Sequence, residues 1–193
     1  MTGRQIGGLV LAAGSGSRLG RPKALVEVGD ERLVDRAVRT LRDGGAEPIV
    51  VVLGAALAEV AGAVVVENPD WATGMGSSLR VGLAALPTDG DAVVVSLVDQ
   101  PDIGPAVVAR LIDAFAAGAT VAVASYSGKR GNPVLFARST WDEVAALAKG
   151  DVGARPFLAA HPELVTPVPC DDIADPADID TPADLARKLS TEG

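Results

Sequence analysis

The chain is poor in side chains that carry covalent chemistry, since its 193 residues include one cysteine and one histidine. The single Cys170 excludes an internal disulfide framework and fits a reducing compartment. It has no cysteine or histidine partner at metal-binding spacing, and Asp171 and Asp172 would raise the pKa of its thiol, so a zinc site and a reactive cysteine are both disfavoured. His161 precedes Pro162 in an expected loop and no Gly-x-Ser-x-Gly elbow is present. A Ser-His-Asp triad is therefore disfavoured, and His161 is expected to be an ordinary surface residue.

Aromatic residues, excess positive charge and long apolar runs are also lacking. Aromatic residues make up 3% of the chain against 48% hydrophobic residues, so the core must consist of Val, Leu, Ile and Ala. A formal net charge of −8 argues against binding to nucleic acid or to an anionic membrane. No apolar run reaches the ~18 residues of a membrane span, and no signal segment opens the sequence. We expect a cytoplasmic protein in which residues 1–193 form one α/β domain.

Short, β-branched apolar runs predict buried parallel strands. These runs are Ile6–Leu11, Ile49–Leu53, Val64–Val66, Ala92–Val98 and Thr120–Ala124. Helical patterns alternate with them: one is stopped by Gly44-Gly45, and another runs from Pro105 to Gly118. This alternation predicts a doubly wound sheet with helices on both faces.

The second half of the sequence is less regular. Asn132–Phe136 is consistent with an antiparallel strand. Ser139-Thr140-Trp141-Asp142 has the pattern of a helix cap, and Thr181-Pro182-Ala183-Asp184 repeats that pattern before an expected last helix at Pro182–Leu189. No linker suggests a second domain.

The segment after the first strand, LAAGSGSRLGRPK at 11–23, combines three glycines with three cations. Glycines allow the backbone to turn tightly and to approach a ligand, and fixed cations beside such a turn suit a polyphosphate. The segment is not a Walker A loop, because the Gly-Lys-Ser/Thr ending is missing. It also departs from the dinucleotide fingerprint, because Leu19 replaces the third glycine. On the residues alone, a glycine-requiring turn beside solvated cations stays open as the alternative.

Asp99 follows the best candidate for a central strand, so it is expected at the sheet edge where α/β proteins bind ligands. A carboxylate facing a polyphosphate would be repelled unless a divalent cation lay between them, and Mg²⁺ is held by one or two carboxylates plus substrate phosphates. Asp180, just before the last helix cap, is free to supply a second metal contact. The alternative is that Asp99 opens a turn before Pro101.

Two glycines also mark the segment Asn68–Arg80. Gly74 and Gly76 permit close backbone approach, and Ser77 and Ser78 are expected to cap the helix that follows. Amide N–H groups at such a helix start could bind a base edge or a phosphate. An ordinary loop with an N-cap explains the same residues.

The segment 11–23 resembles the Leu-Ala-Ala-Gly-x-Gly-x-Arg-x-Gly-x-Pro-Lys signature of nucleotidyltransferases with the MobA-like fold. Within that superfamily the chain is most similar to the molybdenum cofactor cytidylyltransferases (MocA-like). The resemblance extends over essentially the whole chain and rests on further motifs in the expected order. They are Asn-Pro-x-Trp at 68–71, Gly-Met-Gly-Ser-Ser-Leu at 74–79, Asp-Gln-Pro at 99–101, Arg-Gly-Asn-Pro-Val-Leu-Phe at 130–136, Gly-Asp-Val-Gly-Ala-Arg at 150–155 and Asp-Ile-Asp-Thr-Pro at 178–182.

The resemblance implies a three-layer α/β/α sandwich with a mostly parallel, Rossmann-like central sheet, of the nucleotide-diphospho-sugar transferase type. It implies that the N-terminal half binds the nucleotide and the C-terminal half the acceptor. The implied catalytic residues are Arg18, Lys23 and Asp99, and the implied metal ligands are Asp99 and Asp180. The implied nucleotide-binding residues are Leu11, Ala12, Ala13, Gly14, Gly16, Arg18, Lys23, Gly74, Met75, Gly76, Ser77, Ser78 and Asp99. The implied acceptor-binding residues are Gly131, Asn132, Pro133, Asp151 and Arg155.

The resemblance also implies a reaction, the transfer of CMP from CTP to the terminal phosphate of the molybdenum cofactor (molybdopterin), which is a substrate here and not a prosthetic group. Mg²⁺ is the implied metal, with Mn²⁺ as the alternative. Family members that use GTP tend to read Leu-Ala-Gly-Gly, so Ala13 favours CTP. Two positions depart from the family pattern: Val98 replaces a common glycine, and Asn132 replaces a common histidine next to the acceptor.

Several alternatives stay open at this point. GTP could replace CTP, and the acceptor could be a sugar phosphate or an alcohol phosphate. A protein of another class, which binds nucleotide or cofactor without transfer, is also compatible with the sequence. The implied partner is a molybdenum hydroxylase-type apoenzyme or its chaperone.

Overall fold

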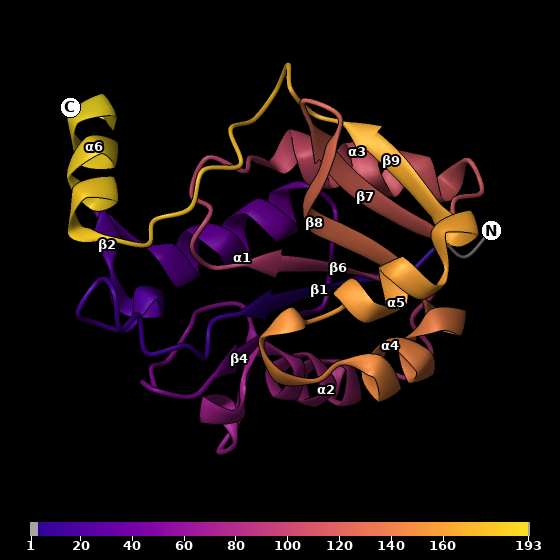
Figure 1. The fold of residues 1–193 in the computed structure, drawn as a ribbon, viewed down its shortest axis with the longest axis horizontal. Helices are drawn as coiled ribbons and strands as arrows, with labels where there is room; N and C mark the ends of the chain where they lie inside the picture. Colours follow the sequence, from indigo (N-terminus) through magenta and orange to yellow (C-terminus); the bar gives the residue numbers. More distant parts are fainter. Residues whose placement is uncertain (1–3, 193) are drawn as a thin grey trace.

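The computed structural model describes residues 4–192 and is built around a seven-stranded sheet (Figure 1). The strand order is β5-β4-β1-β6-β8-β7-β9. The bounds are β1 Ile6–Leu11, β4 Ile49–Leu53, β5 Val64–Glu67, β6 Ala92–Leu97, β7 Val121–Tyr126, β8 Lys129–Ala137 and β9 Val165–Pro169. Only β8 runs antiparallel to its neighbours within this sheet. The expected mostly parallel, Rossmann-like sheet is confirmed.

Helices cover both faces of the sheet (Figure 1). One face carries α1 (Leu33–Asp43) and α3 (Pro105–Ala116), and the other carries α2 (Met75–Ala85), α4 (Trp141–Leu147) and α5 (Arg155–Ala160). The last helix, α6 (Pro182–Glu192), lies instead beside β2 (Glu27–Val28), which pairs with β3 (Glu31–Arg32). The molecule is therefore the expected three-layer sandwich with a small hairpin and one helix outside the layers.

Two separate apolar clusters fill the spaces above and below the sheet. Side chains alternate along each strand, so Val10 packs in the cluster under α1 and α3 while Leu9 and Leu11 pack in the cluster under α2. Both clusters are aliphatic for the most part, as the scarcity of aromatic residues predicts. A strand with apolar residues on both faces is typical of a parallel sheet covered on each side.

The switch in strand order lies between β1 and β6. From β1 the chain moves outward through β4 and β5 on one side, and it later returns to place β6 on the other side of β1. In open α/β sheets the crevice at the carboxyl ends of such strands is where ligands bind. The segments that follow β1 and β6 are the glycine-rich loop and the residues around Asp99.

Some predicted elements differ from the structure. β6 ends at Leu97, so Val98 lies in the turn, and β8 begins at Lys129, before the expected Asn132. The apolar pattern of the sequence does not predict β9, because Pro167 and Pro169 interrupt it. Prolines are tolerated there because β9 is an edge strand and needs fewer backbone donors.

The two predicted helix caps have different outcomes. At α6 the hydroxyl of Thr181 accepts from the backbone N–H of Asp184 at 3.2 Å, and the Asp184 carboxylate accepts from the N–H of Thr181 at 2.8 Å, so this cap is confirmed. The cap at α4 is wrong, because the hydroxyl of Thr140 donates back to the carbonyl of Ala137 at 2.8 Å. The short 3-10 turn Arg138–Thr140 before α4 turns this hydroxyl away from the helix start.

Cys170 is fully buried in the structure. Burial raises the pKa of its thiol, Arg110 partly opposes this rise, and Asp172 adds to it. The predicted direction is confirmed, although the main cause is burial and not the neighbouring carboxylates.

Within residues 4–192, no helix is long and apolar enough to cross a membrane.

His161 lies between two carboxylates. Its Nε2 lies 2.8 Å from Glu143 on α4, and its Nδ1 lies 3.3 Å from Glu163. The hydrogen bond to Glu143 raises the pKa of His161 above its ordinary value, and Glu163 adds to this effect. Because the raised pKa belongs to the folded state, the protonated ring stabilises the fold at pH values below about 6.5, and this contribution is lost as pH rises through the folded-state pKa.

We therefore expect His161→Gln to lower the melting temperature at pH 6 and to have little effect at pH 8.5. Melting temperatures of both proteins from pH 5.5 to 9 measure this. A difference between the two proteins that stays constant with pH would show that protonation of His161 does not contribute.

Candidate functional site

A cavity of about 570 Å³ opens at the carboxyl ends of β1 and β6. Its wall comes from the loop after β1, the segment before and at the start of α2, the turn after β6, and one residue each from the 150–153 loop and the C-terminal segment. The lining residues are Leu11, Ala12, Ala13, Gly14, Ser15, Gly16, Ser17, Arg18, Lys23, Trp71, Ala72, Gly74, Met75, Ser78, Leu97, Val98, Asp99, Asp151 and Asp180. Most of the nucleotide residues that the resemblance implies therefore meet in one cavity.

The glycine-rich loop folds back tightly on itself. Gly16 has a φ of +62°, and its carbonyl accepts the backbone N–H groups of Leu19 at 2.9 Å and Gly20 at 2.8 Å. A Cβ atom on Gly16 would lie 2.0 Å from the carbonyl oxygen of Arg21, so only glycine fits. Gly14 lines the cavity and has no atom within 4 Å of its missing Cβ, so the space beside its backbone is open.

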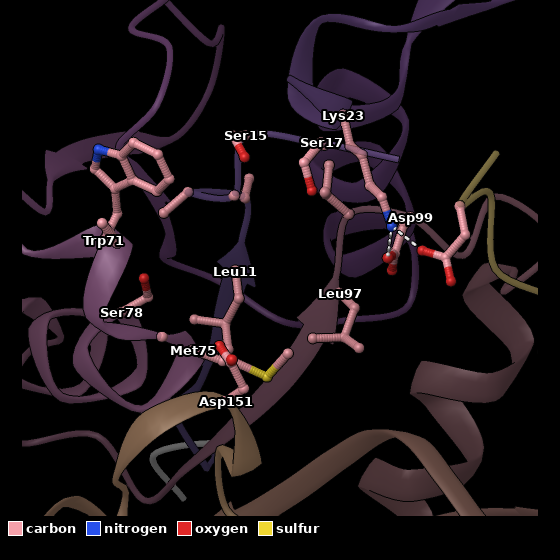
Figure 2. Close-up of a pocket in the computed structure, with 18 of the residues that line it drawn as sticks. Leu11, Ser15, Ser17, Lys23, Trp71, Met75, Ser78, Leu97, Asp99 and Asp151 are labelled. Carbon is pink, nitrogen blue, oxygen red and sulfur yellow. Dashed lines mark hydrogen bonds and ion pairs between the residues drawn. The ribbon is translucent and has the colours of Figure 1, made fainter. Parts of the chain in front are cut away.

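Four charged side chains gather at one end of the cavity. The ammonium of Lys23 donates to Asp99 Oδ2 at 2.6 Å and also to Asp180 (Figure 2). The guanidinium of Arg18 lies 2.9 Å from the other oxygen of Asp180 and is largely exposed. The N-terminal loop, the end of β6 and the C-terminal segment thus meet in one ionic cluster. The resemblance implied Lys23 as a phosphate contact and Asp99 and Asp180 as metal ligands, but it did not imply the ion pairs between them.

Lys23 is held firmly in its charged form. Burial by itself lowers the pKa of its ammonium, but the hydrogen bonds to Asp180 and Asp99 outweigh this effect, and the pKa rises above its ordinary value of 10.5. Lys23 is therefore a fixed cation near neutral pH and is not suited to act as a general base.

Backbone contacts fix Asp180 beside Asp99. The N–H of Ile179 donates to the carbonyl of Asp99 at 2.9 Å, and the side-chain amide of Gln100 donates to the carbonyl of Pro176 at 3.0 Å. The side chain of Ile179 is buried in the core. These contacts tie the C-terminal segment across the end of β6.

The carboxylates retain capacity for a cation. Asp99 Oδ1 is buried and has no hydrogen-bond partner among the described residues. Asp178 lies close enough to feel the charge: partial desolvation raises the pKa of its carboxyl, and repulsion from Asp99 and Asp180 raises it further. No set of three or more His, Cys, Asp and Glu side chains within residues 4–192 could hold a metal by itself. Asp99 and Asp180 fit Mg²⁺, which needs one or two carboxylates and completes its shell with phosphate and water.

The start of α2 packs directly on the 150–153 loop. Gly74 has a φ of +112°, and a Cβ on it would lie 2.4 Å from the carbonyl carbon of Gly150. A Cβ on Gly76 would lie 2.7 Å from the backbone nitrogen of Lys149 and 2.8 Å from the carbonyl carbon of Ala148. This contact brings Asp151 into the same cavity as Met75, so the implied acceptor and nucleotide segments share a wall.

The prediction that Ser77 and Ser78 cap α2 is wrong. The helix begins at Met75 with Gly74 as its N-cap, so both serines lie inside the first turn. Gly74 has a φ of +112°, a conformation open to glycine, and this allows the early start. Of the residues implied for this helix start, Gly74, Met75 and Ser78 line the cavity, whereas Gly76 and Ser77 do not.

Trp71 was not among the predicted site residues, although the Asn-Pro-x-Trp motif contains it. Its side chain lines the cavity and packs so closely on Gly54 that a Cβ there would lie 2.5 Å from the Trp71 Cβ. In Figure 2, Trp71 and Ser78 lie at the end of the cavity opposite Lys23 and Asp99. Ser15, Ser17 and Leu97 also line the cavity. The Asn-Pro-x-Trp motif could have identified Trp71 as a site residue, whereas nothing in the sequence distinguishes Leu97.

The remaining implied acceptor residues do not line this cavity. The antiparallel register of β8 pairs Val134 with Val95, which carries Gly131, Asn132 and Pro133 to the same edge of the sheet where β6 ends. The hydroxyl of Tyr126 donates to the carbonyl of Asn132 at 2.9 Å and holds this segment. Arg155 begins α5 and also lies outside the lining.

A doubly wound sheet with a glycine-rich loop at its switch point is the architecture of the nucleotide-binding α/β class. The chain belongs to the MobA-like NTP transferase domain family, whose model matches residues 8–165. The superfamily that the sequence resembles is thereby confirmed. Asp180 and α6 lie beyond the matched residues.

The relatives of this chain carry names that refer to different activities. The chain is 38% identical to the nicotine blue oxidoreductase of Paenarthrobacter nicotinovorans, over 94% of this chain and 95% of that protein. It is 49% identical over 47 residues to a probable molybdenum cofactor guanylyltransferase of Opitutus terrae, over 24% of this chain and 23% of that protein. The crystal structure of Rv0371c from Mycobacterium tuberculosis H37Rv superposes with a TM-score of 0.82 at 33% identity, covering 98% of this chain and all of that one. A second structure of Rv0371c is a complex with manganese.

Proposed function

We propose that the protein transfers CMP from CTP to the terminal phosphate of molybdenum cofactor and releases pyrophosphate. The observation that carries this proposal is the cluster of Lys23, Asp99 and Asp180 next to the glycine-rich loop. A protein that merely bound a nucleotide would have little need for two carboxylates beside the phosphate site. The family model supports nucleotidyl transfer as the reaction class.

In the proposed reaction an oxygen of the acceptor phosphate attacks the α-phosphorus of CTP in line. A new P–O bond forms, the bond to the β-phosphate breaks, and pyrophosphate leaves with the electron pair. A phosphate oxygen is ionised near neutral pH, so the attack needs no strong general base, and the described cavity lining contains no histidine.

The chain's own residues would contribute position and charge. The turn at Gly14 and Gly16 leaves room for the triphosphate, while Lys23 and Arg18 supply fixed positive charge as negative charge develops on the leaving group. The proposed metal ligands are Asp99 and Asp180. A bound Mg²⁺ or Mn²⁺ would neutralise phosphate charge at this place. The manganese complex of Rv0371c supports a divalent metal in a similar protein.

CTP is the proposed donor because Ala13 lines the cavity where GTP-using relatives tend to have glycine. Its methyl group would narrow the base site against a purine. The residues proposed for the acceptor are Gly131, Asn132, Pro133, Asp151 and Arg155. Of these, Asp151 has the most direct support, because it lines the cavity.

Residues 1–193 would act as one domain, with the nucleotide bound by the N-terminal half and the acceptor by the C-terminal half. The proposed location is the cytoplasm, in keeping with a single buried cysteine. The finished cofactor would pass to a molybdenum hydroxylase-type apoenzyme or its chaperone.

A redox activity is the second candidate, because a relative that is similar over nearly the full chain is called an oxidoreductase. An oxidoreductase that binds a nucleotide cofactor could use the same cavity. It would have no evident use for two carboxylates clustered around Lys23.

Pyrophosphate release tests the proposal directly. The purified protein with Mg²⁺ is given each of the four nucleoside triphosphates, with and without molybdenum cofactor, and oxidation of reduced nicotinamide nucleotides is followed in parallel. We expect pyrophosphate only with CTP and the cofactor together. Turnover with GTP but not CTP would overturn the base choice, and nicotinamide nucleotide oxidation without pyrophosphate would favour the second candidate.

A further inference from the structure

Asn68 is a buried polar residue at the end of β5, with 1% of its surface exposed. The backbone N–H of Asp70 donates to Asn68 Oδ1 at 3.0 Å. An N–H group needs an acceptor, so this contact fixes which side of the amide carries the oxygen. The Asn68 Nδ2 group therefore faces the other way, toward α2.

The two hydrogens of Asn68 Nδ2 go to two neighbouring serines. Nδ2 donates to Ser77 Oγ at 2.8 Å and to Ser78 Oγ at 3.0 Å. Both serine hydroxyls must therefore use their own hydrogens elsewhere. Asn68 thus sets the hydrogen-bond direction of both side chains.

The hydroxyl hydrogen of Ser77 is used within the protein, and that of Ser78 is not. Ser77 donates to the carbonyl of Gly74 at 2.8 Å, with the carbonyl of Asp70 at 3.1 Å. The hydroxyl of Ser78 has no acceptor for its hydrogen among residues 4–192. Only 4% of the surface of Ser78 is exposed, and the residue lines the cavity. A nearly buried hydroxyl with an unused hydrogen is suited to donate to a ligand.

The place of Ser78 identifies which part of a nucleotide it would meet. Ser78 and Trp71 lie at the end of the cavity away from Lys23 and Asp99 (Figure 2). If the triphosphate lies at the cations, the base reaches the Trp71 end.

We propose that Asn68 is a positioning residue that holds Ser78 as a hydrogen-bond donor and thereby selects a base whose edge presents acceptors. This inference rests on the proposed function in that it requires a nucleotide in this cavity. Cytosine presents two acceptors, N3 and O2, on its pairing edge. Uracil carries a hydrogen on N3 and guanine carries one on N1. A Ser78 hydroxyl that donates to this position of the base would therefore meet a second donor. The hydrogen-bond polarity of the Asn68 amide would then discriminate between cytosine and uracil. These two bases differ little in size, so the methyl group of Ala13 could not distinguish them.

The variant Asn68→Asp tests this inference because it changes hydrogen-bond polarity with almost no change of shape. The new carboxylate can still accept from the N–H of Asp70, but it cannot donate to either serine. The Ser78 hydroxyl would turn its hydrogen toward the carboxylate and present an acceptor to the ligand. Ser78→Ala removes the donor outright and is the matched variant.

Binding of CTP, UTP and 3-deaza-CTP, which lacks the N3 acceptor, is measured by calorimetry with Mg²⁺ for the unaltered protein and both variants. Inorganic tripolyphosphate is the control ligand, since it engages only the cationic end. We expect CTP to bind the unaltered protein at least ~10-fold more tightly than UTP, as an unmatched buried donor predicts. In both variants we expect this preference to fall to about threefold or less, with tripolyphosphate binding unchanged.

Two results would overturn the inference. One is an unchanged ratio of CTP to UTP affinity in Asn68→Asp, and the other is an equal loss of tripolyphosphate binding, which would show a merely structural role. Transfer of CMP could still stand in either case. Conversely, a CTP preference that depends on Asn68 without any pyrophosphate release would sustain this inference and sink the proposed transfer.

Discussion

Replacement of Asp99 by Asn is expected to lower CMP transfer by ~10²–10³-fold while the protein stays folded. The change removes the negative charge that Lys23 contacts at 2.6 Å, and it places a neutral amide where Oδ1 is buried without a partner. A cation held between the protein and the phosphates would lose one of its two carboxylates. We expect the loss to appear mainly in kcat and in a higher Mg²⁺ concentration for half-maximal rate.

The fold should tolerate this change because the structural role of residue 99 uses its backbone. The carbonyl of Asp99, and not its side chain, accepts from Ile179. Asp113→Asn, on the exposed side of α3, makes the same change of charge far from the cavity and should leave turnover unaltered. Near-normal turnover of Asp99→Asn with Mg²⁺, at unchanged melting temperature, would contradict the proposed metal site.

The second large effect is expected for Gly74→Ala, which should destabilise the fold by about 3 kcal/mol. An alanine there is strained, because the φ of residue 74 is +112°, and its Cβ would lie 2.4 Å from the carbonyl carbon of Gly150. The atoms that this Cβ would meet, in Gly150 and Asp151, all belong to the backbone, so the 150–153 loop must move. For a chain of this length the melting temperature should fall by about 6–12 °C. Because Met75 and Asp151 both line the cavity, nucleotide affinity should fall as well.

Gly118→Ala is the matched control for backbone strain. Gly118 has nearly the same φ, +109°, but no atom lies within 4 Å of its missing Cβ. It should lower stability by about 1 kcal/mol, the strain contribution alone, and leave nucleotide binding intact. Equal destabilisation by the two variants would show that the contact between Gly74 and the 150–153 loop is unimportant.

The central sheet was predictable because its strands are local signals. Runs such as Ile6–Leu11 and Ile49–Leu53 are apolar on both faces, and this pattern survives in the sequence without knowledge of the neighbours. Elements whose stability depends on partners were harder to predict. β9 contains two prolines and forms a strand only because β7 offers it an edge.

The same division holds for the site. The glycine-rich loop could be predicted because Gly16 must be glycine for reasons that lie within the loop, namely its φ and the closeness of Arg21. Serine favours the N-cap position in general, and this preference predicts Ser77 and Ser78 as caps, but the backbone at Gly74 starts α2 earlier. Their hydrogen-bond directions depend on Asn68, which lies nine residues before Ser77 and ten before Ser78, and residue propensities do not reveal these contacts.

By itself, the sequence determined the class of fold and the position of the glycine-rich loop, and it led to the hypothesis that the carboxylates at residues 99 and 180 hold a metal, because strand pattern, glycine spacing and charge are properties of short segments. Only the tertiary structure decided that Lys23 bridges those two carboxylates, that the 150–153 loop shares a wall with α2, and that Asn68 Nδ2 donates to the Ser78 hydroxyl. The physical reason is that the first two depend on contacts between segments far apart in the chain, while the third depends on how the turn between β5 and α2 is folded. Such contacts are set by how the sheet and its covering helices pack, and not by the identity of neighbouring residues.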